Sequence, residues 1–253
     1  MIRPEELTSN RVYDGLASSY GFDVDANLSA RLKYDLALKY LRPDDDVLDV
    51  GCANGIHMRL LAEKCRRITG IDLNDAMLDI ARVTLAADGL ANPSLERRSA
   101  TDLGFADASF DLVYSFSTLL LVPDIERAFR EISRVLRPGG IALLDITGRW
   151  NLSRIYWGMY YRRHGHFGLH SFSYRKIVEQ LESLGLTVIE SHALGFLDQW
   201  RYIPGLHWCK FLDRLLHASL QRDLDYRTSN MPWSFPLANR WYIACRRAGA
   251  SNP

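Results

Sequence analysis

The middle of the chain alternates short apolar runs with longer segments of helical periodicity. Five short runs are predicted to be strands: residues 47–50, 67–72, 94–97, 110–115 and 141–146. Between the last two, residues 124–137 repeat apolar side chains at the spacing of one buried helical face. Because strands and helices alternate, the sequence predicts an α/β fold with a doubly wound parallel sheet and helices on both faces.

Capping residues mark the ends of these helices. Asp124 can begin the helix over 124–137, and the Pro-Gly-Gly segment 138–140 can end it. Asn74 and Gly89 bracket a second predicted helix in the same way. Before the sheet, apolar residues at helical spacing predict an N-terminal helix over residues 29–41, namely Leu32, Leu36, Tyr40 and Leu41.

The last hundred or so residues differ in character, because all six tryptophans lie beyond residue 146. They fit either an apolar substrate pocket or a second packing layer. Residues 173–184 are predicted to form a helix that ends at Gly185, and a further helical stretch is expected near residues 206–220. Residues 186–190 and 240–245 have the composition of strands.

Composition narrows the class of protein. The 253 residues are 47% apolar and 24% charged, which suits one globular domain over residues 1–253. We divide it into a helical cap (1–45), a core (46–146) and a C-terminal part (147–253) with an insertion at 197–238. Lys plus Arg number 31 against 30 Asp plus Glu, so no nucleic acid or membrane partner is expected, but rather a small molecule.

Targeting and metal signals are not found. The four scattered cysteines form no zinc-type spacing and no metal site is predicted. No run of residues resembles a signal peptide or a membrane span, so a cytoplasmic protein is expected.

The strongest local signal is the glycine turn that follows the first predicted strand. Gly51 and Gly55 let the backbone approach a ligand closely, and the helix that follows offers free N–H groups. Asp72 ends the second predicted strand, where an acidic side chain can accept hydrogen bonds from both ribose hydroxyls of an adenosine-type cofactor. Both features belong at the carboxyl ends of the strands, where an open α/β sheet binds ligands.

Together these segments resemble the class I S-adenosylmethionine-dependent methyltransferases, in particular the small-molecule branch typified by ubiquinone-biosynthesis methylases. The resemblance covers about residues 13–146. It rests on six segments: 13–20, 48–55, 70–73, 102–113, 122–124 and 136–140. It implies a seven-stranded, Rossmann-like sheet with an antiparallel last strand, in which 186–190 and 240–245 are the two remaining strands.

The resemblance also implies S-adenosylmethionine as the cofactor. Asp49 and the backbone of Gly51, Cys52 and Gly55 would hold its methionine part. Asp72 would hold the ribose, and Leu73 and Met77 would lie against the adenine. Further cofactor contacts are expected from Tyr20, Ala53, Ser99, Ala100, Thr101 and Ser115. Two of these depart from the family: Ala53 replaces the usual middle glycine, and Ser99 replaces an acidic residue that touches the adenine amine, for which the Ala100 or Thr101 backbone or Asp102 are substitutes.

Methyl transfer needs the nucleophile, methyl carbon and sulfur in line, and a hydroxyl acceptor also benefits from a general base. Histidine suits that role near neutral pH, and His164, His166 and His170 precede the predicted helix 173–184. We favour His170. Asp145, near the end of the fifth strand, is a second candidate base with a structural hydrogen-bonding role as its alternative, whereas His57 is expected to be a helix residue.

Three functions remain open. The first is methyl transfer to an O or N atom of a small molecule, such as a lipid or sugar intermediate. The second is an NAD(P)-dependent oxidoreductase, which shares the acidic residue on strand two but needs a G-x-G-x-x-G spacing that residues 51–55 lack. The third is an S-adenosylmethionine-binding module without catalysis.

Overall fold

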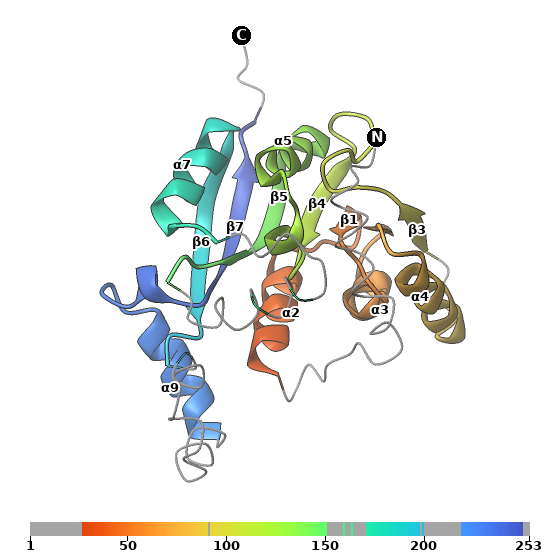
Figure 1. The fold of residues 1–253 in the computed structure, drawn as a ribbon. Coiled ribbons are helices and arrows are strands. Elements are labelled where there is room, and N and C mark those ends of the chain that lie inside the picture. Colours follow the sequence, from red (N-terminus) through yellow and green to blue (C-terminus); the bar gives the residue numbers. More distant parts are fainter. Residues whose placement is uncertain are drawn as a thin grey trace.

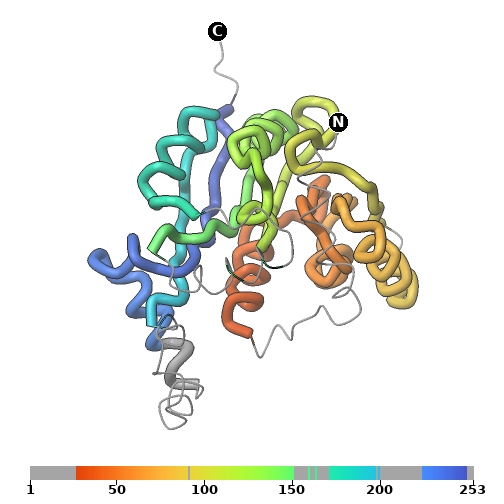
Figure 2. The backbone as a smooth tube through the Cα atoms, viewed as in Figure 1, coloured from red at the N-terminus to blue at the C-terminus, as the bar shows by residue number. Residues whose placement is uncertain are grey.

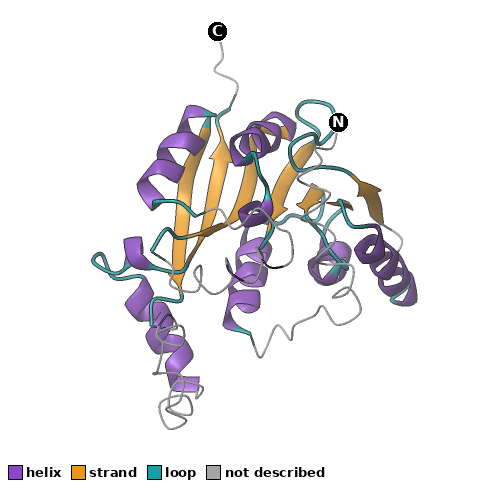
Figure 3. Ribbon diagram, viewed as in Figure 1, coloured by secondary structure: helices purple, strands orange, loops and turns teal. Residues whose placement is uncertain are grey.

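A computed structural model describes residues 27–90, 92–150, 171–197 and 219–249, together with positions 159, 163 and 199. Within these ranges the chain forms one seven-stranded sheet in the order β3-β2-β1-β4-β5-β7-β6 (Figures 1 and 3). The strands are β1 (Asp46–Val50), β2 (Arg67–Asp72), β3 (Pro93–Arg97), β4 (Phe110–Ser115), β5 (Leu136–Thr147), β6 (Leu186–Leu194) and β7 (Arg240–Arg247). β7 pairs antiparallel with both β5 and β6, and the other pairs are parallel. The predicted fold class is confirmed.

Helices cover both faces of this sheet. The described helices are α2 (Leu28–Tyr40), α3 (Ile56–Leu61), α4 (Asp75–Ala87), α5 (Ile125–Val135), α7 (Tyr174–Ser183) and α9 (Ser219–Ser229), with short 3₁₀ turns η1 (Ala62–Lys64), η2 (Leu119–Leu121) and η4 (Phe235–Leu237). Buried side chains of α5 and α7 share one apolar cluster with Leu48 and Ile243 of the sheet. Side chains of α2, α3 and α4 share the cluster on the other face with Val47 and Leu143.

The predicted caps and boundaries compare closely with the observed ones. Asn74, Asp124 and Ser173 each accept a backbone N–H bond at the start of α4, α5 and α7. The helix predicted over 124–137 ends instead at Val135, and β5 begins at Leu136 rather than at residue 141. Pro138 disfavours helical geometry in the residue before it, so the chain leaves the helix early and continues directly into the sheet.

The N-terminal helix lies beside the last strands of the sheet, although they are far apart in sequence (Figure 2). Ser29 of α2 is hydrogen-bonded to Tyr242 of β7 at 2.8 Å. Of the four residues predicted to face inward, only Leu36 is fully buried; Ala30, Lys33 and Ala37 are buried with it. A lysine therefore occupies a core position that the apolar pattern did not mark.

Several predicted features lie outside the described residues: Tyr20, the histidines 164, 166 and 170, positions 198 and 200–218 of the insertion 197–238, and thereby most of the helical stretch 206–220. Of the three described tryptophans, Trp241 is fully buried, whereas Trp150 and Trp233 are about 60% exposed. No helix in the described part of the chain is long and apolar enough to cross a membrane.

Candidate functional site

The glycine turn after β1 is held against the end of β2. Gly51 and Cys52 donate backbone hydrogen bonds to the Ile71 carbonyl at 2.8 and 2.9 Å. Gly51, Ala53 and Gly55 all have positive φ values, of +83°, +48° and +77°. Two glycines thus stand where left-handed geometry favours them, and Ala53 adopts that geometry despite its Cβ.

Glycines in and beside this turn also leave space that neighbouring side chains fill. A Cβ on Gly51 would lie 2.1 Å from the Thr118 hydroxyl oxygen, so the side chain of Thr118 takes that space. On β2, Gly70 leaves room for the Cys52 and Met58 side chains in the same manner. Gly51 therefore serves close packing between two chain segments in addition to its φ value.

Asp72 lies at the carboxyl end of β2 and faces the turn. Its carboxylate accepts hydrogen bonds from the backbone N–H groups of Ala53 and Asn74, each at 2.9 Å. Burial raises the pKa of Asp72, and these backbone donors oppose the rise. No ion pair engages its carboxylate among the residues that the structure describes. The acidic group is therefore fixed beside the turn without a cation to neutralise it.

Asp49 on β1 is a second buried carboxylate at the same edge. It is 2% exposed, and burial raises its pKa to about 8; the neighbouring Tyr114 hydroxyl opposes the rise, and the charge of Asp72 adds to it. Tyr114 is its cross-strand neighbour on β4. Within the described ranges, Asp49 Oδ2 and the Tyr114 hydroxyl have no hydrogen-bond partner. A buried acceptor oxygen without a donor is costly, so this position suits a ligand that brings one.

The residues after β3 are buried rather than open. Ser99 is 2% exposed, its hydroxyl lies 2.9 Å from the Thr101 hydroxyl, and it accepts the Thr101 backbone N–H. Ala100 is also buried. Met77 is packed in the core at the start of α4, and Leu73 is half-buried. The Ser99 hydroxyl is thus engaged within its own segment.

Ser115, at the end of β4, has its side chain turned into the sheet. It is fully buried and its hydroxyl donates to the Val50 carbonyl at 2.9 Å. Ser115 thereby ties the ends of β1 and β4 together. These two strands border the point where the strand order reverses, which is where ligands bind in open α/β sheets.

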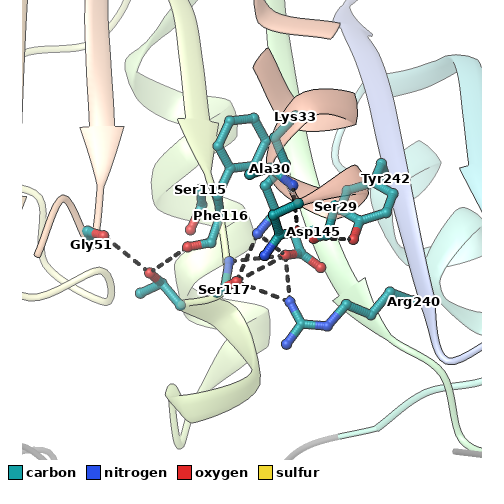
Figure 4. Close-up of polar contacts among 12 residues, drawn as sticks. Ser29, Ala30, Lys33, Gly51, Ser115, Phe116, Ser117, Asp145, Arg240 and Tyr242 are labelled. Atoms are coloured by element: carbon teal, nitrogen blue, oxygen red, sulfur yellow. Dashed lines mark hydrogen bonds and ion pairs between the residues drawn. The ribbon is translucent and has the colours of Figure 1, made fainter. Parts of the chain in front are cut away.

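Asp145 on β5 is the centre of a buried polar cluster (Figure 4). Its Oδ2 lies 2.9 Å from Lys33 Nζ and 2.7 Å from an Arg240 nitrogen, and it accepts hydrogen bonds from the backbone and hydroxyl of Ser117. Burial alone would raise the pKa of Asp145, but Arg240 and Lys33 outweigh it and hold the pKa at about 2. A carboxylate this acidic is a weak base, so the geometry favours the structural alternative for Asp145.

His57 lies on the first turn of α3, edge-on to the Phe116 ring at 5.1 Å. Burial and the nearby Lys33 lower its pKa to about 3, so it is neutral at physiological pH. Its aromatic packing agrees with the expected role as a helix residue. Among the described side chains, no three His, Cys, Asp or Glu residues gather as metal ligands.

Sequence reasoning missed Lys33, Ser117, Thr118 and Arg240. Ser117 and Thr118 lie two and three residues after the end of β4, and the position after a parallel strand was the available signal for them. Lys33 interrupts the inward face of an otherwise apolar helix, which is a weak signal by itself. Arg240 carried no local signal, since its partner Asp145 lies 95 residues away.

The arrangement fits a cationic nucleoside cofactor. Two buried acidic side chains, Asp49 and Asp72, flank one glycine turn without an ion-pair partner in the described part of the chain, and a buried oxygen of Asp49 has no donor there. S-adenosylmethionine carries an ammonium group and ribose hydroxyls, which can donate hydrogen bonds to such oxygens.

Comparison with known proteins points the same way. A family model described as a methyltransferase domain matches residues 48–144. The methyltransferase GfsG of Streptomyces halstedii is 36% identical over 112 residues, which are 43% of this chain and 40% of that protein. The demethylmenaquinone methyltransferase of Listeria monocytogenes is 30% identical over 156 residues, which are 58% of this chain and 65% of that protein. The chain therefore spans less than two thirds of the length of these relatives.

Solved structures extend the likeness over most of the chain. The [4+2]-cyclase SpnF superposes with a TM-score of 0.66 at 19% identity and covers 99% of both chains. An S-adenosylmethionine-dependent methyltransferase from Mesorhizobium loti has a TM-score of 0.64 at 18% identity and covers 89% of this chain and 100% of its own. Residues 48–144 therefore match a methyltransferase domain, and the likeness to these solved structures shows that the chain shares their fold.

Proposed function

We propose that the protein transfers the methyl group of S-adenosylmethionine to an oxygen or nitrogen atom of a small molecule. The observation that carries this proposal is the pair of carboxylates, Asp49 and Asp72, on either side of the glycine turn in the matched domain. A dinucleotide site would need a phosphate-binding G-x-G-x-x-G turn, and residues 51–55 have a different spacing.

In this proposal the turn and the residues around it each contact a particular part of the cofactor. Asp72 would accept bonds from the ribose hydroxyls, and the free oxygen of Asp49 would accept from the methionine ammonium group. Leu73 and Met77 would lie against the adenine, with the backbone at Ser99, Ala100 and Thr101 closing its edge. Cys52, Ala53 and Gly55 would shape the turn. When bound, S-adenosylmethionine supplies a methyl group on a good leaving group, so the protein mainly has to orient the acceptor.

The acceptor side is less defined. Relatives that are named for demethylmenaquinone and malonyl-[acyl-carrier protein] support a small or carrier-bound acceptor, including lipid-like ones. His170 remains our candidate general base and Tyr20 a candidate cofactor contact, both outside the described residues. Asp145 would act by orienting its neighbours, because its low pKa disfavours proton abstraction. We expect this reaction to take place in the cytoplasm.

A binding module without methyl transfer is the alternative that one comparison favours. The [4+2]-cyclase shares this fold over 99% of its chain, so the fold alone does not fix the reaction. Transfer of labelled methyl from S-adenosylmethionine to any acceptor would exclude such a module. Metabolite profiling of a strain without the gene, for a missing product 14 mass units heavier than its precursor, would identify the acceptor.

The Asp72→Ala variant tests the cofactor site. Charge-assisted hydrogen bonds contribute about 1.5–3 kcal/mol, so this variant should bind S-adenosylhomocysteine roughly 10- to 100-fold more weakly in calorimetry. Asp107→Ala is the matched control, because that carboxylate is 75% exposed and pairs with Arg134 at the amino end of β4, opposite the turn. Equal affinity of Asp72→Ala and the wild type would contradict the proposed site.

A further inference from the structure

The buried cluster around Asp145 consists of four residues, Lys33, Ser117, Asp145 and Arg240, and we call it the Lys33 cluster. It joins four parts of the chain: α2, β5, β7 and the segment that follows β4. Lys33 and Arg240 both contact the same two oxygens, Asp145 Oδ2 and Ser117 Oγ, at 2.7–2.9 Å. The side chains of Lys33 and Asp145 are 6% and 0% exposed. Buried ion pairs often stabilise a fold no better than apolar residues would, so this cluster calls for a role beyond stability.

Ser117 is the member whose backbone depends on the others. Its φ is +59°, in the left-handed region that few residues other than glycine adopt. Its N–H and its hydroxyl both bond to Asp145, and the hydroxyl also accepts from Lys33 and Arg240. A strained residue persists only when its surroundings hold it, and here the surroundings are the Lys33 cluster.

Thr118 carries this geometry to the glycine turn. Its hydroxyl lies 3.3 Å from the carbonyl oxygens of both Gly51 and Phe116 and can donate to either. Its side chain occupies the space that a Cβ on Gly51 would need. A change in the backbone at Ser117 would therefore shift Thr118 and remove a support of the turn.

We propose that Lys33 is a positioning residue for the methyl-transfer site. From α2, Lys33 holds Ser117 in place, so that Thr118 stays packed against Gly51. The inference rests on the proposed function, because it assumes that this turn binds the cofactor. Lys33 acts through Ser117 and Thr118. Lys33 therefore affects the cofactor site by fixing the position of the backbone at residues 117–118.

The first test compares variants of two lysines on the same helix. Lys33→Met keeps the length of the side chain and removes its charge. It should bind S-adenosylhomocysteine about tenfold more weakly in calorimetry, as expected when a charge-assisted contact is lost. Lys33→Arg should recover most of the affinity. Lys39→Met is the control, since Lys39 pairs with Glu190 at the surface and should leave the affinity unchanged. All titrations are made well below the unfolding temperature of each variant.

A second substitution separates positioning from a general loss of stability. Glycine adopts positive φ without help, so Ser117→Gly added to Lys33→Met should restore the affinity that Lys33→Met loses. If Lys33→Met does not fold, Ser117→Ala takes its place, because alanine keeps the strain at this position but lacks the hydroxyl that is held. That variant should also bind more weakly.

The outcomes distinguish the two proposals. If the wild type binds S-adenosylhomocysteine and Lys33→Met or its substitute Ser117→Ala binds it equally well, the positioning role is overturned and the proposed function stands. If Lys33→Met is weaker but Ser117→Gly gives no recovery, the route through Ser117 is overturned. If the wild type itself does not bind, both the proposed function and this inference fail.

Discussion

At the scale of single residues, Ala53 has a backbone conformation that a glycine would adopt at lower cost. Its φ of +48° lies in the left-handed region, which costs a non-glycine residue roughly 1–2 kcal/mol. Ala53→Gly removes that cost but frees the unfolded chain, so we expect a net gain in the free energy of unfolding of about 0.5–1 kcal/mol. Urea denaturation measures it.

The same substitution elsewhere should have the opposite sign. Ala86 is exposed and lies within the regular helix α4, so Ala86→Gly should lower the free energy of unfolding by about 1 kcal/mol. If Ala53→Gly is as destabilising as Ala86→Gly, the left-handed strain at residue 53 is not present.

Asp49 predicts a pH dependence of stability. Its pKa is about 8 in the folded protein, against about 3.9 for an aspartate in an unfolded chain. Its contribution to stability is therefore fully present below about pH 4 and is lost as the pH rises to about 8, because the unfolded chain releases the proton first. Asp49→Asn should abolish this decline, which urea midpoints measured between pH 5 and 8 would show. Parallel pH profiles for the two proteins would contradict it.

Cofactor binding should release the proton that the Asp49 carboxyl carries at neutral pH. If the cofactor ammonium meets Asp49, binding favours the charged carboxylate and lowers its pKa. Calorimetry of S-adenosylhomocysteine at pH 7 in buffers of different ionisation enthalpy should then show release of up to one proton. Asp49→Asn should bind more weakly and release none.

The sequence predicted those candidate site residues that carry a local signal. Asp49, Gly51, Gly55 and Asp72 stand at fixed offsets from strand ends, and strand ends can be recognised from short apolar runs. The Lys33 cluster could not be predicted in this way. Its contacts join residues 28 to 123 positions apart, and only the packed fold brings them together.

At the scale of helices and strands, two N-terminal caps offer a matched pair. Asn74 accepts the Met77 N–H at the start of α4, and Asp124 accepts the Arg127 N–H at the start of α5. Each alanine substitution should cost about 1 kcal/mol of the free energy of unfolding. Only Asn74 adjoins the candidate site, because its backbone N–H donates to Asp72.

Asn74→Ala should therefore also weaken binding of S-adenosylhomocysteine several-fold, whereas Asp124→Ala should leave binding unchanged. Thermal unfolding and calorimetry on the two variants measure both effects. Equal affinities would mean that the α4 cap does not help to place Asp72.

Helices and strands in the core were predictable, and their ends were predictable to within a few residues. Caps and apolar periodicity marked α4, α5 and α7, since these signals act within one or two turns. β6 and β7 extend beyond the predicted ranges, to Leu194 and Arg247. The extra residues of each strand pair with the predicted part of the other strand, 191–194 with 240–243 and 246–247 with 186–187, and a local pattern does not contain these partners.

At the scale of the whole molecule, the strand order places the proposed site at the boundary between β1 and β4. Chain order alone does not give this arrangement, because β4 adds to the opposite side of β1 from β2 and β3. The fold class was predicted from alternating elements, and the antiparallel β7 only from the family resemblance. Its pairing with β5 is what carries Arg240 to Asp145, so the C-terminal strands complete a cluster that begins on the first described helix.

Ligand-dependent stability of the whole protein tests the choice between cofactors. A ligand that binds only the folded state at 100 times its Kd adds about 2.7 kcal/mol to the free energy of unfolding. For a domain of this size we expect S-adenosylhomocysteine to raise Tm by about 5–10 °C. NAD should leave Tm unchanged, because residues 51–55 lack its phosphate-binding spacing, and Asp72→Ala should reduce the response to S-adenosylhomocysteine at equal concentration. A shift with NAD and none with S-adenosylhomocysteine would favour the oxidoreductase, since the acidic residue on β2 would then serve a dinucleotide.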